Sequence, residues 1–442
     1  LRDRIVSMDV ALQMPSADDL DIAVAAEHVR LEQVLVNLLQ NALDAVGEAG
    51  AVTIEVIRNE NDIRVRLCDS GPTALLPRGD RHWGVIHGVA REDAYEVSQV
   101  DGAPAYGGTP SDESVRQAIR ELKSRGLEVT LYPFVFMDCP GYPWRGRVAG
   151  TDGAGAAAEI AALFGGPEDW GLRRMALHYA RIAAEEGAVG LLIGSEMRGV
   201  TWTRDAAGGF PAVDQLRTLA AECRAVVGPD VAISYAADWS EYAGVRDGGE
   251  VWFHLDPLWA DANIDFIGID NYMPLSDWRD GEAHTDSAWS TPHDPAYLQA
   301  NIAGGEGFDW YYANDADDRS QTRSPITDGA YDEPWVYRYK DLRNWWTCQH
   351  HPRIEGVRQS VPTAWVPQSK PFRFTEFGCA AIDKGTNQPN AFVDVKSSES
   401  LLPYFSSGHR DDFLQNRFSG MGVRAILPKP LSAHDLIWAL PS

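Results

Sequence analysis

The sequence predicts an α/β protein whose central part, residues 83–418, is a (β/α)8 TIM barrel flanked by two fragments of different character. Apolar, β-branched segments alternate there with amphipathic helices, as in parallel sheets. Each strand candidate starts apolar and finishes in polar or aromatic residues. Glutamate stands at two of those ends, as Glu196 and Glu376. These observations favour a barrel with a site at the carboxyl ends of its strands.

The barrel strands are expected in six segments, namely residues 82–90, 127–138, 189–197, 231–239, 264–273 and 372–379. A doubly wound open sheet is the alternative, but no G-x-G-x-x-G follows any of these segments. The carboxyl ends of TIM-barrel strands form the active-site face. Polar residues gathered at those ends therefore predict an enzyme site.

Amphipathic helices are expected between the strands, in residues 114–126, 169–187 and 213–228. Each finishes in a glycine, which favours the left-handed conformation that ends many helices. The alternation of strand and helix supports βα units and a parallel sheet.

Only six of the eight strands of a barrel are found. If residues 82–90 are the second strand, the two glutamates fall on strands four and seven. One strand is then missing before this segment and another after Glu376, so the barrel is expected to be incomplete at both ends. An open barrel exposes strand edges, which suggests a chimera of gene or assembly origin. The catalytic interpretation requires a closed barrel and carboxyl groups about 5 Å apart.

Composition restricts the partners. The formal net charge of −25 over 442 residues argues against nucleic acid. The five cysteines are scattered without C-x-x-C spacing, so neither a zinc site nor a disulfide framework is indicated. We also expect no cofactor. No apolar run approaches the roughly 18 residues that span a membrane. The chain starts at Leu1 without a signal peptide, which suggests a fragment and leaves localisation open.

Glycoside hydrolysis requires two carboxyl groups on either side of the scissile bond, and Glu196 with Glu376 is the candidate pair. The 15 Trp fit either sugar-stacking platforms or a barrel core. The pairs His254 with Asp256 and His350 with His351 lack a third ligand at metal-site spacing. The acidic run at residues 314–319 is expected to be a solvated loop rather than a calcium site. We therefore expect no metal.

The placement on strands four and seven resembles the superfamily of retaining (β/α)8 glycosidases. The resemblance implies that Glu196 is the acid/base, that Glu376 is the nucleophile and that Tyr272 hydrogen-bonds the nucleophile. Ser195 stands where that superfamily usually has asparagine. Further strand-end residues that could line sugar subsites are Asp238, Trp239, Asp270 and Asn271.

A longer resemblance runs through most of residues 83–418. Its segments include GSEMRG, ADWSEY, FHLDPLWAD, IDFIGIDNYMPLSDWRD and FTEFGCAAIDKGTNQPN. Together they resemble the TIM-barrel-like domain of tail or baseplate proteins of gene transfer agents and related phages. The resemblance implies a tail component that is assembled in the bacterial cytoplasm, contacts other tail proteins and contacts or trims cell-envelope polysaccharide. A non-catalytic structural or receptor-binding component is the alternative.

The flanks resemble a hybrid sensor kinase. In residues 1–77, the helix LEQVLVNLLQNALDA and the segment CDSGP resemble a histidine-kinase ATP-binding domain, which implies nucleotide-binding roles for Asn41 and Asp69. Two alternating runs, VTIEVI and IRVRLCD, predict a β-hairpin between those motifs. The glycine-rich lid and the phosphoacceptor helix are missing, so the two residues are expected to be vestigial. Residues 420–442 resemble the end of a receiver domain, with Lys429 at its lysine, but lack the phosphate-accepting aspartates. We expect no kinase activity.

Overall fold

The computed structural model describes residues 112–135, 144–169, 171–281, 283–391 and 402–421, together with the backbone of five short strands within residues 9–104. The chain divides into two compact units. One comprises Leu1–Arg78 with Val85–Val97, and the other comprises Gly79–Gly84 with Ser98–Ser442. The predicted domain boundaries are not tested by this division and stay predictions.

The first unit contains a three-stranded sheet in the order β1 (Asp9–Gln13), β2 (Ala49–Arg58), β3 (Ile63–Asp69). Strands β2 and β3 are antiparallel neighbours, so the predicted hairpin is confirmed. Asp69 is the last residue of β3. The predicted helix and Asn41 lie outside the described residues.

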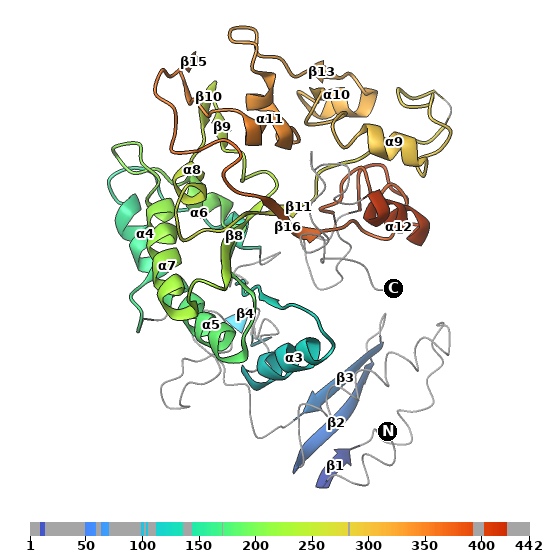
Figure 1. The fold of residues 1–442 in the computed structure, drawn as a ribbon. Helices are drawn as coiled ribbons and strands as arrows, with labels where there is room; N and C mark the ends of the chain where they lie inside the picture. Colours follow the sequence, from blue (N-terminus) through green and yellow to red (C-terminus); the bar gives the residue numbers. More distant parts are fainter. Residues whose placement is uncertain are drawn as a thin grey trace. The chain divides into compact units, whose positions relative to one another are not determined.

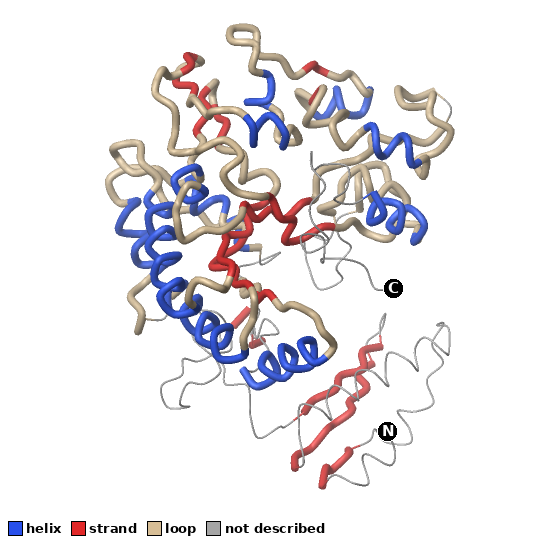
Figure 2. Tube along the Cα trace, viewed as in Figure 1, coloured by secondary structure: helices blue, strands red, loops and turns tan. Residues whose placement is uncertain are grey.

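The second unit contains a parallel sheet of five strands, drawn in Figures 1 and 2. Its order is β16 (Phe372–Phe377), β11 (Ile267–Asn271), β8 (Ala232–Asp238), β7 (Gly190–Ser195) and β6 (Thr130–Leu131). Each strand lies within one of the predicted segments, and its neighbours run parallel to it. The structure therefore has an α/β fold with a parallel, half-barrel sheet.

The sheet is buried because its central strands are apolar. All six residues of β7 are buried, and so are the residues of β11. On α7 (Pro211–Val227) the buried residues recur at helical spacing, among them Leu216, Leu219 and Cys223. Fully burying one leucine side chain contributes about 2 kcal/mol. This apolar stripe holds α7 against β7, β8 and α5 (Leu172–Glu186), and Figure 1 shows α4 (Ala156–Phe164), α5 and α7 side by side.

The predicted helix ends are confirmed. Helix α5 ends at Gly187, whose φ is +67°, and α7 ends at Gly228 with a φ of +79°. Gly126, with a φ of +80°, follows α3 (Asp112–Ser124). A residue with a Cβ atom rarely adopts this conformation, and glycine does so without steric cost.

The described sheet has two edge strands, β6 and β16. Strand β6 is much shorter than the predicted segment 127–138, and Pro133 follows it closely. Proline has no N–H to donate to a ladder, which limits the strand there. Among the described residues after β16, none joins the sheet, and helix α12 (Asp412–Met421) packs against α9 (Pro295–Ala300) instead. The predicted strand at 82–90 lies outside the described residues, so the expected incompleteness of the barrel at both ends stays a prediction.

Short elements separate β11 from β16, and Figure 2 shows mostly loop in this stretch. They are β12 (Trp310–Tyr311), α10 (Asp315–Ser320), β13 (Ser324–Pro325), the 3₁₀ helix η4 (Pro334–Tyr337), α11 (Leu342–Thr347), β14 (Arg353–Ile354) and β15 (Val357–Arg358), after α9. Strands β14 and β15 extend a second sheet with β9 (Val245–Asp247) and β10 (Glu250–Trp252). No helix among the described residues is long and apolar enough to cross a membrane.

Candidate active site

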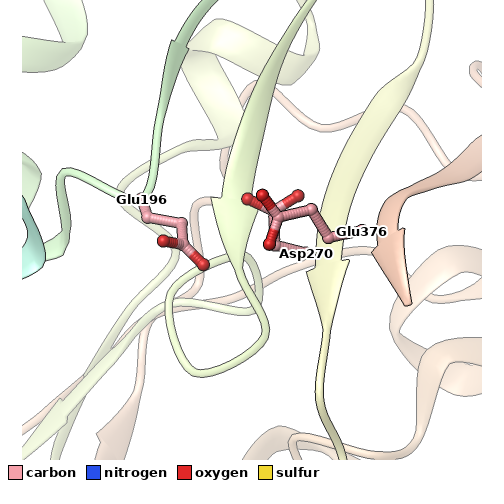
Figure 3. Close-up of side chains that lie close together, drawn as sticks. All are labelled: Glu196, Asp270 and Glu376. Carbon is pink, nitrogen blue, oxygen red and sulfur yellow. The ribbon is translucent and has the colours of Figure 1, made fainter. Parts of the chain in front are cut away.

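Three carboxylates meet where the parallel strands end. Glu196 follows β7 directly, Asp270 lies near the end of β11, and Glu376 lies near the end of β16. One oxygen from each lies within 4.8 Å of one from each of the others. Figure 3 shows Glu196 facing Glu376 and Asp270. Parallel strands bring their carboxyl ends to one edge of a sheet, so residues far apart in the sequence converge here.

Glu196 is buried and held by an indole and a guanidinium. Trp144 donates from Nε1 to Glu196 Oε2 at 2.7 Å, and Arg145 Nη2 lies 2.9 Å from the same oxygen. Burial raises the pKa of Glu196 to about 8, against the opposing influence of Arg145. Because burial is the larger influence, this carboxyl group can hold a proton near neutral pH despite its cationic neighbour.

Arg145 lies in the 3₁₀ helix η3 (Arg145–Arg147), and only 6% of its side chain is exposed. It donates from Nε to the carbonyl oxygen of Ser195 at 2.8 Å, and from Nη2 to the Ser195 hydroxyl. Its guanidinium centre also lies 4.5 Å from the centroid of the Phe134 ring. Trp144 and Arg145 were not predicted from the sequence, since they lie outside any strand and carry no motif of their own.

Asp270 is fully buried, close to both glutamates. Its Oδ2 accepts hydrogen bonds from the hydroxyl groups of Tyr132 and, at 3.3 Å, Ser195. Its Oδ1 accepts from Thr375 Oγ1 at 2.7 Å. Burial, reinforced by the charge of Glu376, raises the pKa of Asp270 to about 7. This carboxylate thus joins hydroxyls that come from three different strand ends.

Glu376 has a different environment. Its side chain is half-buried, and Tyr272 donates its hydroxyl to Glu376 Oε2 at 2.7 Å. Burial, together with the charge of Glu376, raises the pKa of Tyr272, so the phenol remains a donor. The contact expected between these two residues is therefore present, while its catalytic role stays a prediction.

The other predicted subsite residues lie around this edge. Asp238 is buried and accepts the backbone N–H of Ser240 at 2.8 Å. Asn271 is also buried, and its Oδ1 accepts the backbone N–H of Met273 at 3.1 Å. Trp239 is half-buried, with its ring centroid 5.0 Å from that of Tyr339. Substrate contact stays a prediction for all of them.

The same three carboxylates are the group, among the described residues, whose oxygens are close enough to share a metal ion. Arg145 already brings positive charge to Glu196 Oε2, and a cation placed there would compete with it. This donor set fits an ion-paired acid better than an open metal centre.

The histidines considered as metal ligands have structural partners instead. His350 is fully buried between Asp256 Oδ2, at 2.8 Å from Nδ1, and the carbonyl oxygen of Trp345, at 2.6 Å from Nε2. His254 is buried, and its Nε2 lies 3.4 Å from Thr201 Oγ1. Burial lowers the pKa of His254 to about 3, so this ring stays neutral.

The acidic run at residues 314–319 includes most of helix α10. Asn314 caps that helix by accepting the N–H groups of Ala316 and Asp317. The acidic side chains in the first turn of α10 lie where the helix dipole favours negative charge. A helix, rather than the expected loop, accounts for this run.

The sequence profile of the GTA TIM-barrel-like domain matches residues 170–427, more than half of the chain. The chain belongs to the GTA TIM-barrel-like domain family. The match includes β7, β8, β11 and β16, and therefore the three strand ends that carry Glu196, Asp270 and Glu376.

Other similarities are partial. The chain is 44% identical over 50 residues to the adaptive-response sensory kinase SasA of Parasynechococcus marenigrum, which is 11% of this chain and 13% of that kinase. The vestigial nucleotide-binding roles of Asn41 and Asp69 and the receiver-like character of residues 420–442 stay predictions.

Among solved structures, the GH113 β-mannanase of Alicyclobacillus acidocaldarius is 22% identical, with a TM-score of 0.26 over 40% of this chain and 48% of that one. A second structure of a GH113 β-1,4-mannanase is 15% identical, with a TM-score of 0.36 over 94% of this chain and 81% of that one.

Proposed function

We propose that the TIM-barrel-like domain of this chain is a retaining glycoside hydrolase, with Glu196 as general acid/base and Glu376 as nucleophile. The observation that carries the proposal is the closeness of the two carboxylates, whose nearest oxygens lie within 4.8 Å of each other. Retaining glycosidases hold their carboxyl groups about 5 Å apart, whereas inverting enzymes leave about 6.5–9.5 Å for a water molecule.

The different environments of the two glutamates support different roles. A general acid must be protonated at the start of the reaction, and burial raises the pKa of Glu196 to about 8. A nucleophile must be held in a fixed orientation toward the anomeric carbon, and the hydrogen bond that Glu376 Oε2 accepts from Tyr272 fixes that carboxyl group.

The reaction proceeds in two steps. Glu376 attacks the anomeric carbon while Glu196 donates its proton to the glycosidic oxygen, so the leaving sugar departs as a neutral alcohol. Glu196, now ionised, removes a proton from water as that water attacks the anomeric carbon. The bond to Glu376 breaks, the sugar is released with its original configuration, and both carboxyl groups return to their starting states.

Membership in the GTA TIM-barrel-like domain family supports a place in the tail of a phage-like particle. There the domain would contact other tail or baseplate proteins. The substrate we propose is a polysaccharide of the cell envelope, which such a tail meets first.

Covalent trapping tests the proposal. The full chain is incubated with a panel of 2-deoxy-2-fluoroglycosyl fluorides, which form a glycosyl-enzyme that hydrolyses slowly, and peptides are then examined by mass spectrometry. We expect one added sugar on the peptide that contains Glu376. E185Q, which alters an exposed carboxylate at the end of α5, is the matched control and should be labelled equally. Labelling of E376Q at the parent rate would contradict the assignment.

A non-catalytic tail component is the second candidate, and the ion pair between Arg145 and Glu196 favours it. Arg145 lowers the pKa of Glu196, which opposes the effect of burial, and an ionised glutamate cannot donate a proton. Absence of labelling and of hydrolysis across the panel, with binding of envelope polysaccharide retained, would support this candidate.

A further inference from the structure

Glu241 is a fully buried carboxylate that the proposed reaction does not use. It lies just after β8, in the ADWSEY segment. Among the described residues no cation pairs with it, and burial raises its pKa to about 8. A buried acid without an ion pair is costly unless hydrogen bonds satisfy it, so its contacts indicate why it is there.

Three donors converge on this carboxyl group. Oε1 accepts from Thr201 Oγ1 at 2.5 Å and from the hydroxyl of Tyr235 at 2.9 Å. Oε2 accepts from the backbone N–H of Asp238 at 3.1 Å. Thr201 belongs to α6 (Arg198–Trp202), the helix that follows Glu196, whereas the other two donors belong to β8. Glu241 therefore ties the chain after Glu196 to the neighbouring strand.

The Tyr235 hydroxyl continues this connection to Glu196. It accepts the backbone N–H of Met197 at 2.7 Å while it donates to Glu241. Met197 follows Glu196 directly, so Glu241 orients the phenol that fixes the peptide bond between these two residues.

That peptide bond must be held in place by its surroundings because Glu196 has a φ of +46°. A non-glycine residue in the left-handed region is strained and persists only where its surroundings enforce it. On one side of Glu196, its own N–H donates to the carbonyl oxygen of Ala236 at 2.8 Å. On the other side, the N–H of Met197 donates to Tyr235. Both anchors belong to β8.

Gly194 provides the space for the second anchor. A Cβ atom at this position would lie 3.3 Å from the Tyr235 ring and 3.0 Å from Met197 Cε. The absence of that atom allows the tyrosine ring to lie close against β7, beneath the turn. The glycine, the tyrosine and Glu241 thus form one support under Glu196.

We propose that Glu241 is a positioning residue for Glu196. Through Tyr235 and Thr201 it holds the strained turn so that the Glu196 carboxylate contacts Trp144 and Arg145 and faces Glu376. The proposal rests on the proposed function only for the reason why Glu196 must be oriented. The hydrogen bonds that connect Glu241 to the turn at Glu196 do not depend on any activity.

The test measures the pKa of Glu196 in the full chain by carbon-13 NMR, with labelled glutamate and with E196Q to assign its signal. The variants are E241Q and Y235F, and Y235F removes one hydroxyl while keeping the ring. Burial is the main cause of the raised pKa of Glu196, so a loosened turn admits water and should lower this pKa by at least about half a unit. E185Q is the matched control and should leave the pKa unchanged.

Kinetics supply the second readout. With any substrate that the parent chain hydrolyses, both variants should lower kcat roughly 10- to 100-fold with little change in KM, because misplacement of a catalytic group has that effect. T201V, which removes one donor but leaves the Met197 link, should have a smaller effect than Y235F. Thermal unfolding of each variant reports whether it is folded.

An unchanged Glu196 pKa in folded Y235F and E241Q would overturn the proposal and leave Glu241 as a satisfied core residue. If E241Q does not fold, Y235F decides alone. A shifted pKa in a chain without hydrolysis would support the positioning role and count against the proposed function. The two proposals can therefore fail separately.

Discussion

The turn after β7 and the end of β16 each carry a glutamate, but the two surroundings differ in burial, charge and backbone. Glu196 is buried, has a left-handed backbone and lies against a guanidinium. Glu376 is half-buried near the end of strand β16 and accepts a hydrogen bond from a phenol. Two identical side chains can thus be prepared for different chemistry by what lies around them. Four predictions test this difference.

Removal of the proposed nucleophile should have the largest effect on hydrolysis. E376Q retains the shape of the side chain but cannot form the ester to the anomeric carbon. We expect hydrolysis of any substrate of the parent chain to fall by roughly four orders of magnitude or more, measured as initial rates. A fall of less than about tenfold would mean that another residue is the nucleophile. The difference between the two glutamates would then have no catalytic meaning.

Loss of the acid/base should be severe but should depend on the leaving group. E196Q cannot donate a proton, so hydrolysis of natural linkages should fall by about 10²- to 10⁴-fold. A dinitrophenyl leaving group needs no protonation, and the first step with such a substrate should slow far less. Equal losses for both leaving groups, in stopped-flow measurements, would argue against the acid role.

Removal of the Tyr272 hydroxyl should have an intermediate effect on kcat. Y272F removes the donor to Glu376 Oε2, and hydrogen bonds to charged groups are worth about 1.5–3 kcal/mol. We expect a fall of at least about tenfold in kcat, with KM little changed, in steady-state kinetics. A change confined to KM would instead assign Tyr272 to substrate binding.

Replacement of Arg145 should shift the pH profile of kcat/KM more than it changes the maximal rate. A general acid acts in its protonated form, so kcat/KM should fall as pH rises through the pKa of Glu196, about 8. Arg145 lowers that pKa, and R145M removes the positive charge. The alkaline limb should therefore move to higher pH by about one unit. A limb that stays in place or moves down would show that Arg145 does not control this proton.

The order of the strands followed from local patterns. Segments 189–197, 231–239, 264–273 and 372–379 each contain a strand of the parallel sheet. Each starts with apolar residues, and helices that finish in Gly187 and Gly228 precede the first two. Such signals act within a few residues of one another. The segment 127–138 shows their limit, since only Thr130–Leu131 pairs with β7. Pro133 and the position at the edge of the sheet shortened this strand relative to its apolar segment.

The candidate site was foreseen only in part. Glu196 and Glu376 were foreseen because parallel strands must end at one edge, and Tyr272 followed from a family resemblance. Trp144 and Arg145 were not foreseen, because a loop contact depends on how distant segments pack and leaves no periodic signal. The position of Asp270 at a strand end was foreseen, but its full burial was not.

The sequence by itself determined that apolar strands alternate with helices and that two glutamates stand at strand ends, because periodicity and helix-ending glycines act locally. Tertiary structure alone decided how these glutamates differ. The raised pKa of Glu196 arises from burial by segments distant in the chain, and its left-handed backbone is held by contacts with β8. Electrostatics and strain depend on distances in space, and those are set only when the chain has packed.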